Sequence, residues 1–210
     1  MRALHGILAA LAVVAACKGN SPAPSAGSAS PPAAMPVAAA GSAGSAAAPA
    51  VPTAPAAPAG TAKPYDGPTF SVASTLSGPD VKDKDIDTEG GKTTMTMYAF
   101  TDPGDDNVMQ MVEHNPITPV GKDQVQKVLE SSMQGMTENV HATVDSQKMI
   151  MVGPDPMLDF SAHFSESDGT FFMRGRVAMK NAHLYQVIAM GKGVTASPSG
   201  EGFVTSFKLK

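Results

Sequence analysis

Apolar and polar residues alternate along most of residues 65–210, a pattern that is typical of β-strands with one buried face. The alternation predicts strands at residues 69–74, 82–88, 92–101, 107–114, 141–152, 157–165, 171–180 and 183–191. Glycine, proline, asparagine and aspartate between these segments predict tight turns. Strands joined by such short turns pair antiparallel, so we expect one antiparallel sheet.

Two helices are expected beside this sheet. Residues 121–137 carry apolar or small side chains at helical spacing, namely Val125, Val128, Leu129, Ser132, Met133 and Met136. On the other side of this helix, Asp123 and Lys127 have the spacing of an ion pair within a helix. A short terminal helix should begin near Ser199, with Ser199 as its cap, and turn Phe203, Val204 and Phe207 inward. The predicted fold class is α+β, an antiparallel sheet with flanking helices.

The first residues have the layout of an export signal. Arg2 precedes an apolar run that ends at residue 16, and the next residue, Cys17, is the single cysteine of the chain. The small residues before Cys17 resemble the lipobox of bacterial lipoproteins. The resemblance implies that residues 1–16 are a signal peptide removed before Cys17, and that Cys17 carries acyl chains such as palmitate.

Two other interpretations of this segment stay open. An ordinary cleaved secretion signal also has small residues before its cut, and an uncleaved anchor would keep the apolar run. The run has about half of the roughly 20 apolar residues that a membrane span needs. Lys18 follows the cysteine, which in enterobacterial lipoproteins accompanies sorting to the outer membrane. We therefore expect an envelope lipoprotein held on the bilayer through Cys17, facing the periplasm or the cell surface.

Residues 17–64 are expected to form a disordered linker. From Gly19 to Pro64, 39 of 46 residues are Ala, Pro, Gly or Ser, and ten of them are proline. Such a stretch has little to bury and cannot offset the entropy lost on ordering. Residues 65–210 remain as one domain, and its 19 acidic residues exceed its 12 Lys and Arg by seven. This charge argues against nucleic acid as a partner.

The predicted domain resembles a bacterial family of exported PsbP-like domains. The resemblance is carried by five short segments: Phe70-Ser71-Val72, Gly91-Lys92-Thr93-Thr94, Arg176-Val177-Ala178-Met179, Leu184-Tyr185-Gln186-Val187 and Ser206-Phe207-Lys208-Leu209. These segments are short and mostly hydrophobic, so the resemblance implies a fold. It brings no catalytic motif to this sequence.

Methionine is the most unusual residue type of the domain. Twelve lie between Met95 and Met190, some in Met-x-Met pairs whose thioethers share one face of a strand. Thioethers suit Cu(I), and His114, His141 and His163 could complete a site together with His183. The alternative is packing, since only five Leu and four Ile are present in the domain. We expect packing, with no metal or cofactor, and place His183 on a strand at a sheet edge.

Motifs for catalysis are missing from the sequence. It has no Gly-x-Ser-x-Gly elbow, phosphate loop or dinucleotide fingerprint. The acidic turn at residues 102–107 lacks the ligand spacing of a calcium loop and is expected to be a plain turn. We expect no catalytic residues and a non-enzymatic lipoprotein that binds an envelope protein, either on the uncovered sheet face or along strand 82–88. A small-ligand or metal-binding module and an exported enzyme of unknown class stay open as alternatives.

Overall fold

The computed structural model of the chain describes residues 61–88, 91–103 and 105–210. The predicted signal peptide at 1–16, Cys17 and nearly all of the linker lie outside the described residues. Across the described ranges, no helix has both the length and the apolar character to cross a bilayer.

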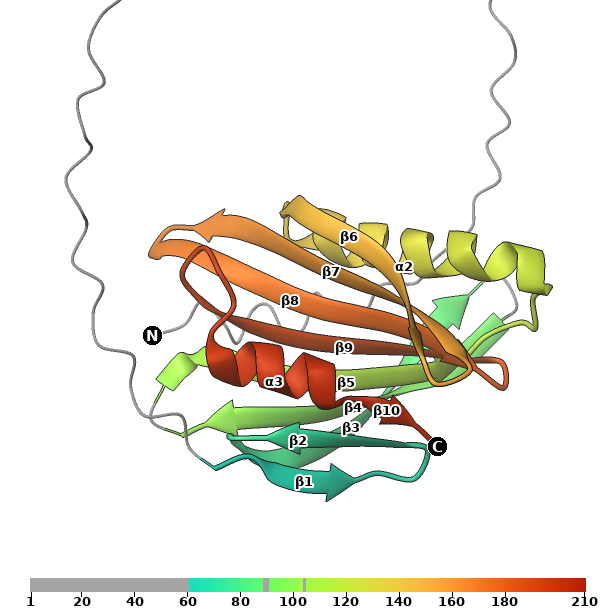
Figure 1. Cartoon of the computed structure of the whole chain (residues 1–210), viewed down its shortest axis with the longest axis horizontal. Coiled ribbons are helices and arrows are strands. Elements are labelled where there is room, and N and C mark those ends of the chain that lie inside the picture. The colour runs from blue at the N-terminus through green and yellow to red at the C-terminus, as the bar shows by residue number, and fades with distance from the viewer. Residues whose placement is uncertain (1–60, 89–90, 104) are drawn as a thin grey trace, which may run out of the picture. The chain divides into compact units, whose positions relative to one another are not determined.

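The domain is built on a large antiparallel sheet of seven strands in the order β3-β4-β5-β9-β8-β7-β6 (Figure 1). Its strands are β3 (Ser77–Thr88), β4 (Gly91–Asp102), β5 (Asp105–Pro116), β6 (Thr143–Val152), β7 (Asp155–Glu166), β8 (Gly169–Lys180) and β9 (His183–Lys192). Each of them overlaps a segment that alternation predicts, although β6 begins at Thr143 and not at residue 141. β9 lies between β5 and β8, so residues far apart in the sequence meet at the centre of the sheet.

A small second sheet has the strand order β1-β2-β10. Its strands are β1 (Lys63–Asp66), β2 (Phe70–Ser74) and β10 (Lys208–Leu209). Only β2 is predicted by alternation, because β1 and β10 are too short to show a period. β1 starts at Lys63, two residues before the domain boundary predicted at 65. The last residue, Lys210, closes this sheet by donating a hydrogen bond to the Gly67 carbonyl at 2.6 Å.

The helices lie close to where their sequence patterns predict them. A short 3₁₀ turn, η1 (Lys122–Gln124), leads into α2 (Val125–Asn139), and α3 (Pro198–Ser206) precedes the final strand. Asp123 lies in the 3₁₀ turn and accepts a hydrogen bond from Gln124, so the predicted helical pair with Lys127 does not form. The prediction of Ser199 as the α3 cap is wrong: Ser197 is the cap, and its hydroxyl accepts a hydrogen bond from the Gly200 amide at 3.1 Å.

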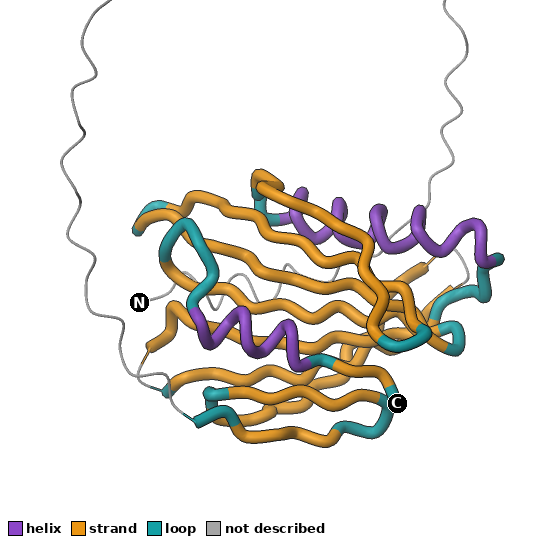
Figure 2. Tube along the Cα trace, in the orientation of Figure 1, coloured by secondary structure: helices purple, strands orange, loops and turns teal. Residues whose placement is uncertain are grey.

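The two helices cover opposite faces of the large sheet (Figures 1 and 2). α2 packs on β6, β7 and β8, with Leu129, Met133 and Met136 buried against the sheet. α3 and the small sheet cover part of the other face. There a second core gathers aromatic rings and aliphatic side chains, namely Phe70, Val72, Tyr98, Phe100, Val112, Tyr185, Val187, Phe203, Val204 and Phe207 among others.

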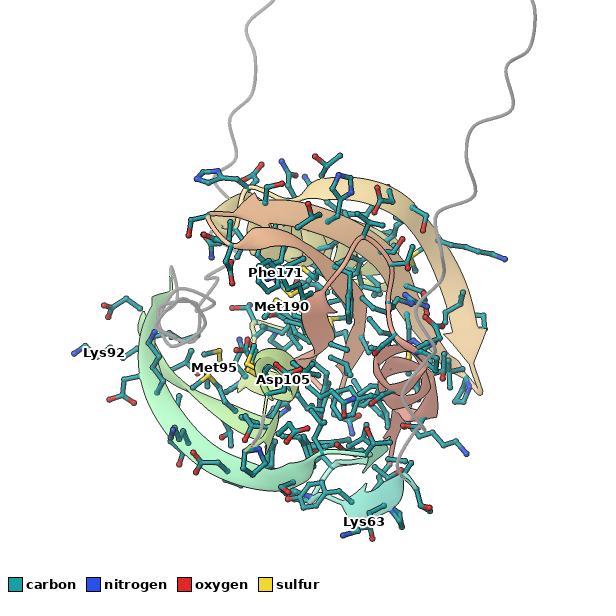
Figure 3. The ribbon with its side chains drawn as sticks, turned by 90° about the vertical axis from the view of Figure 1, so that its left-hand side faces the viewer. Lys63, Lys92, Met95, Asp105, Phe171 and Met190 are labelled. Atoms are coloured by element: carbon teal, nitrogen blue, oxygen red, sulfur yellow. The ribbon has the colours of Figure 1, made fainter. Side chains whose placement is uncertain are left out.

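The large sheet is strongly curved, as its end view shows (Figure 3). Met95, Phe171 and Met190 point to the concave side, where α2 packs, whereas Lys92 points outward from β4. Curvature of this kind follows from the twist that β-strands accumulate across a sheet. The concave face and the opposite face therefore enclose separate sets of side chains.

Candidate functional site

A groove with a volume of about 660 Å³ lies on the face of the large sheet opposite α2, beside α3. Strands β6, β7 and β8 form its floor, and α3 and the segment before it form a wall. Its lining combines charged and hydroxyl side chains with apolar ones, and it includes Asp145, Ser146, Asp159, Ser161, His163, Phe172, Arg174, Val194 and Glu201. The sequence leaves two candidate binding surfaces, the uncovered part of the sheet face and strand 82–88. The groove lies on the first of them.

Arg174 organises the centre of the groove. Its guanidinium pairs with Asp159 and also with Glu201 of α3, where Nε and Oε2 are 2.7 Å apart. Nη1 donates to the carbonyl oxygens of Phe160 and Gly175 at 2.7 and 3.1 Å. Burial alone would lower the pKa of Arg174, but the hydrogen bonds and charges of Glu201 and Asp159 raise it above its ordinary value. The side chain is a fixed cation that ties α3 to the sheet.

Asp159 continues this network across the sheet. Its second oxygen accepts two hydrogen bonds from Arg176, at 2.7 Å from Nη2 and 3.1 Å from Nε. Arg176 is directly opposite Asp159 in the register of β7 and β8, and Arg174 lies two residues before it on the same face. One carboxylate therefore pairs with two neighbouring cations and links them across the floor of the groove.

The outer rim of the groove belongs to β6, an edge strand of the large sheet. The register of β6 against β7 shifts between Val144 and Ser146, so Asp145 is the extra residue of a bulge. Asp145 Oδ1 lies 2.8 Å from Nδ1 of His163 on β7. Val144 is 37% exposed. This rim offers an unpaired strand edge next to a polar hollow, an arrangement suited to an extended segment.

The other candidate surface, the charged strand, is the opposite edge of the sheet. Asp and Lys alternate along β3, so the lysines point to the face of Met95 and Met97 and Asp83 and Asp85 point to the other face. The Lys82–Asp80 pair has side chains that are 60% and 64% exposed. Asp83 and Asp85 accept hydrogen bonds from threonine hydroxyls of β4. Charges on an edge strand prevent pairing with other strands. Such charges are consistent with an edge that resists strand pairing, and the groove described above does not include residues of β3.

Most methionines of the domain lie inside it. Nine of the twelve are buried: Met95, Met97, Met109, Met111, Met133, Met136, Met157, Met173 and Met190. All of these except Met157 belong to the core on the concave face. Met151, in contrast, is 64% exposed. This distribution is what core packing predicts, and the described residues hold no group of three or more His, Cys, Asp or Glu able to bind a metal.

One carboxyl lies within this methionine core. Glu113 of β5 is 1% exposed, and neither of its carboxyl oxygens has a hydrogen-bond partner among the described residues. Burial raises its pKa to about 8, although the charge of Lys84 acts in the opposite direction. Gln186 of β9 is its cross-strand neighbour, and the Gln186 amide donates to Ser132 of α2 at 2.9 Å. Sequence reasoning missed Glu113, because it reads as an ordinary polar position of a strand.

The fold brings two of the four domain histidines together. His114 of β5 and His183 of β9 have ring centroids 6.1 Å apart, and His114 also stacks on Tyr98 and Tyr185. Burial lowers the pKa of His114, and His183 lowers it further. His183 begins a central strand, so the expectation that it lies at a sheet edge is wrong. His141 and His163 lie elsewhere.

Ser199 and the acidic turn show no catalytic or metal-binding arrangement in the described part of the chain. The Ser199 hydroxyl lies within hydrogen-bond distance of Thr75 and accepts from Gln110 Nε2 at 2.9 Å. These contacts tie α3 to β5 and to the residue that follows β2, and they place no histidine or carboxylate of the described residues beside the hydroxyl. In the acidic turn, Asp102 ends β4 and Asp105 begins β5.

No family model and no curated protein matches the sequence. A protein from Bacteroides thetaiotaomicron is 12% identical with a TM-score of 0.41 over 72% of this chain and 49% of its own, so the chain spans about half its length. Cyanobacterial PsbP from Synechocystis is 10% identical with a TM-score of 0.48 over 78% of this chain and 100% of its own. A protein of unknown function from Pseudomonas aeruginosa is 8% identical with a TM-score of 0.29 over 63% of this chain and 84% of its own.

Proposed function

We propose that the chain is a lipoprotein anchored through acylated Cys17, whose PsbP-like domain binds an envelope protein and catalyses no reaction. The groove on β6, β7 and β8 is the observation that carries this proposal, because it combines a hollow with an exposed strand edge. The position of Cys17 after an apolar run and the linker of small residues support the anchor. The partner is reached from the bilayer across residues 17–64.

The groove is suited to recognition by a protein segment rather than to chemistry. Arg174, Asp159 and Glu201 already pair with one another, so none of them stands ready as a nucleophile or a general base. The edge of β6 supplies backbone groups for an added strand, and the charged floor supplies the side-chain selectivity. A partner strand paired with β6 would place alternate side chains on the groove side of the sheet, next to Ser146.

Photo-crosslinking in intact cells tests the site. A photoreactive residue placed at Ser146 or at Ser161 should give the same discrete crosslinked species, and one placed at Thr205, on the exposed side of α3, should not. Reversing the charge of the partner-facing rim by Asp145→Lys should remove the species from both groove positions. Equal crosslinking from Thr205, or none from either groove position, would contradict the proposal.

The anchor is tested independently. Cys17→Ala should move the protein from the membrane fraction to the soluble fraction, and mass spectrometry of the parent's amino-terminal peptide should show acylation at Cys17. A free thiol on Cys17 in the membrane-bound protein would contradict the anchor while leaving the groove untouched.

A further inference from the structure

Three buried acceptor oxygens on the α2 side of the large sheet have no hydrogen-bond donor among the described residues. They are the two carboxyl oxygens of Glu113 and the side-chain oxygen of Gln186. Glu113 and Gln186 are directly opposite each other on β5 and β9, and both are buried. The amide nitrogen of Gln186 is committed to Ser132. Buried acceptors without a partner are costly, so this place calls for a bound cation or a proton.

Two thioethers border the same place. Met97 of β4 is directly opposite Glu113, and Met111 precedes Glu113 by two residues on the same face of β5. Positions opposite or diagonal to each other in an antiparallel pair are within reach of long side chains. Methionine has three rotatable bonds, so both sulfur atoms can turn toward the carboxyl. Packing accounts for the methionines but not for the unpartnered oxygens beside them.

We propose that Met97, Met111 and Glu113, with the side-chain oxygen of Gln186, bind one Cu(I) ion. Thioether sulfur is a soft ligand that selects Cu(I), and the carboxylate supplies the single negative charge that balances it. The positive charge of Lys84, which acts on Glu113, opposes a divalent ion more strongly than a monovalent one. The bound ion replaces the proton that Glu113 carries when neutral, so one proton is released for each ion.

A second row of thioethers provides an internal comparison. Met109, Met190 and Met173 are opposite one another on β5, β9 and β8. The buried side-chain atoms that lack a hydrogen-bond partner in the described residues belong to Glu113, His114 and Gln186, and none of these residues is in this row. If thioethers alone attracted copper, this row would bind it as well. The proposal requires the carboxyl and therefore assigns the ion to the row of Glu113.

Titration of the full chain with Cu(I) tests the proposal. The chain carries Cys17→Ala in every sample, so that no thiol competes, and Cu(I) is kept reduced in the absence of oxygen and exchanged against a chromophoric Cu(I) chelator. One Cu(I) per chain is expected, with release of one proton. Met97→Leu and Met111→Leu, which nearly conserve volume, should each lower the affinity about tenfold or more. Glu113→Gln should do the same and abolish the proton release.

Two matched controls come from the same chain. Met173→Leu changes the second thioether row, and Met157→Leu changes a buried methionine on the opposite face, so both should leave the Cu(I) affinity unchanged. X-ray absorption of the loaded chain should show sulfur and oxygen neighbours that the Glu113→Gln variant loses in part. Absence of stoichiometric Cu(I), or equal losses in Met173→Leu and Met97→Leu, would overturn the site and leave Glu113 with its proton. Neither result bears on the groove, which lies on the other face.

Discussion

The concave face of the large sheet is packed with methionine around one carboxyl, whereas the opposite face is packed with aromatic rings and then gives way to ion pairs. Both faces belong to the same strands, because alternate side chains point to opposite sides. On β5, for example, Met111 and Glu113 lie on the concave side, whereas Val112 lies among the rings.

This difference teaches how each face tolerates change. Rings such as Phe70 and Tyr98, whose centroids are 5.0 Å apart at an angle of 81°, interlock in defined geometries. Thioether side chains adapt to irregular space and tolerate substitution. The ion pairs of the groove keep contact with water, since Glu201 is 48% exposed. The aromatic face is fixed by shape, the methionine face is adaptable, and the groove is fixed by charge.

The largest effect is expected from the aromatic core. Phe100→Ala removes a ring that is 2% exposed and should lower the free energy of unfolding by about 3–5 kcal/mol. Met111→Leu, on the concave face, should lower it by less than about 1.5 kcal/mol. Urea unfolding of both variants measures the contrast. Equal losses would show that the methionine face is as shape-specific as the aromatic face.

Glu113→Gln should remove a pH dependence from the concave face. The folded-state pKa of Glu113, about 8, lies above its ordinary value of 4.5, so the folded protein binds the proton more tightly than the unfolded chain. The resulting stability is complete below pH 4.5 and is lost as the pH rises through 8. The variant should therefore be more stable than the parent at pH 9, by an amount on the order of 5 kcal/mol, and about equal to it at pH 4. Unfolding midpoints of the parent and the variant, measured between pH 4 and pH 9, test this prediction. Midpoints that change with pH in the same way in both proteins would contradict it.

In the groove, Arg174→Ala should cost about 1–2 kcal/mol of unfolding free energy. The substitution leaves Glu201 without its pair, whereas Asp159 keeps Arg176. Lys82→Ala removes an exposed pair of the β3 edge and should change stability by less than about 0.5 kcal/mol. Denaturant unfolding measures the loss of unfolding free energy in both variants. Similar losses would mean that the ion pairs of the groove stabilise the fold no more than an exposed surface pair does.

The smallest effect is expected at the α3 cap. Ser197→Ala leaves the Gly200 amide without its acceptor and should lower the free energy of unfolding by about 1 kcal/mol. Thr205→Ala, in an exposed position of the same helix, is the matched control and should have little effect. Thermal unfolding separates them. If Thr205→Ala lowered the free energy of unfolding as much as Ser197→Ala or more, the cap would contribute little.

Local patterns in the sequence predict the strands of the large sheet and both helices, because period and spacing are local properties. They do not predict β1, where Lys63 and Pro64 have the composition of the linker, or β10, which is two residues long. The Ser197 cap is also missed, because Ser197 and Ser199 are equally plausible caps until the helix start is known.

The candidate sites depend on long-range pairing and are less visible. Asp159, Arg174 and Glu201 come from β7, β8 and α3, and nothing in their sequence spacing links them. Glu113 shares the face of Met109 and Met111 in the strand pattern, but its complete burial depends on neighbouring strands that sequence spacing does not reveal. Methionine content, in contrast, is visible from composition and indicates the character of the concave core.

The small sheet determines how the domain responds to mechanical load. Force that enters along the chain at Lys63 reaches β1 first, which is held by four residue pairs to β2 and by the contacts of Tyr65 with Phe70, Tyr98 and Phe100. We expect these few contacts to yield before the long ladders of the large sheet. A pull on the domain should then peel away β1 first and leave both the methionine core and the groove intact.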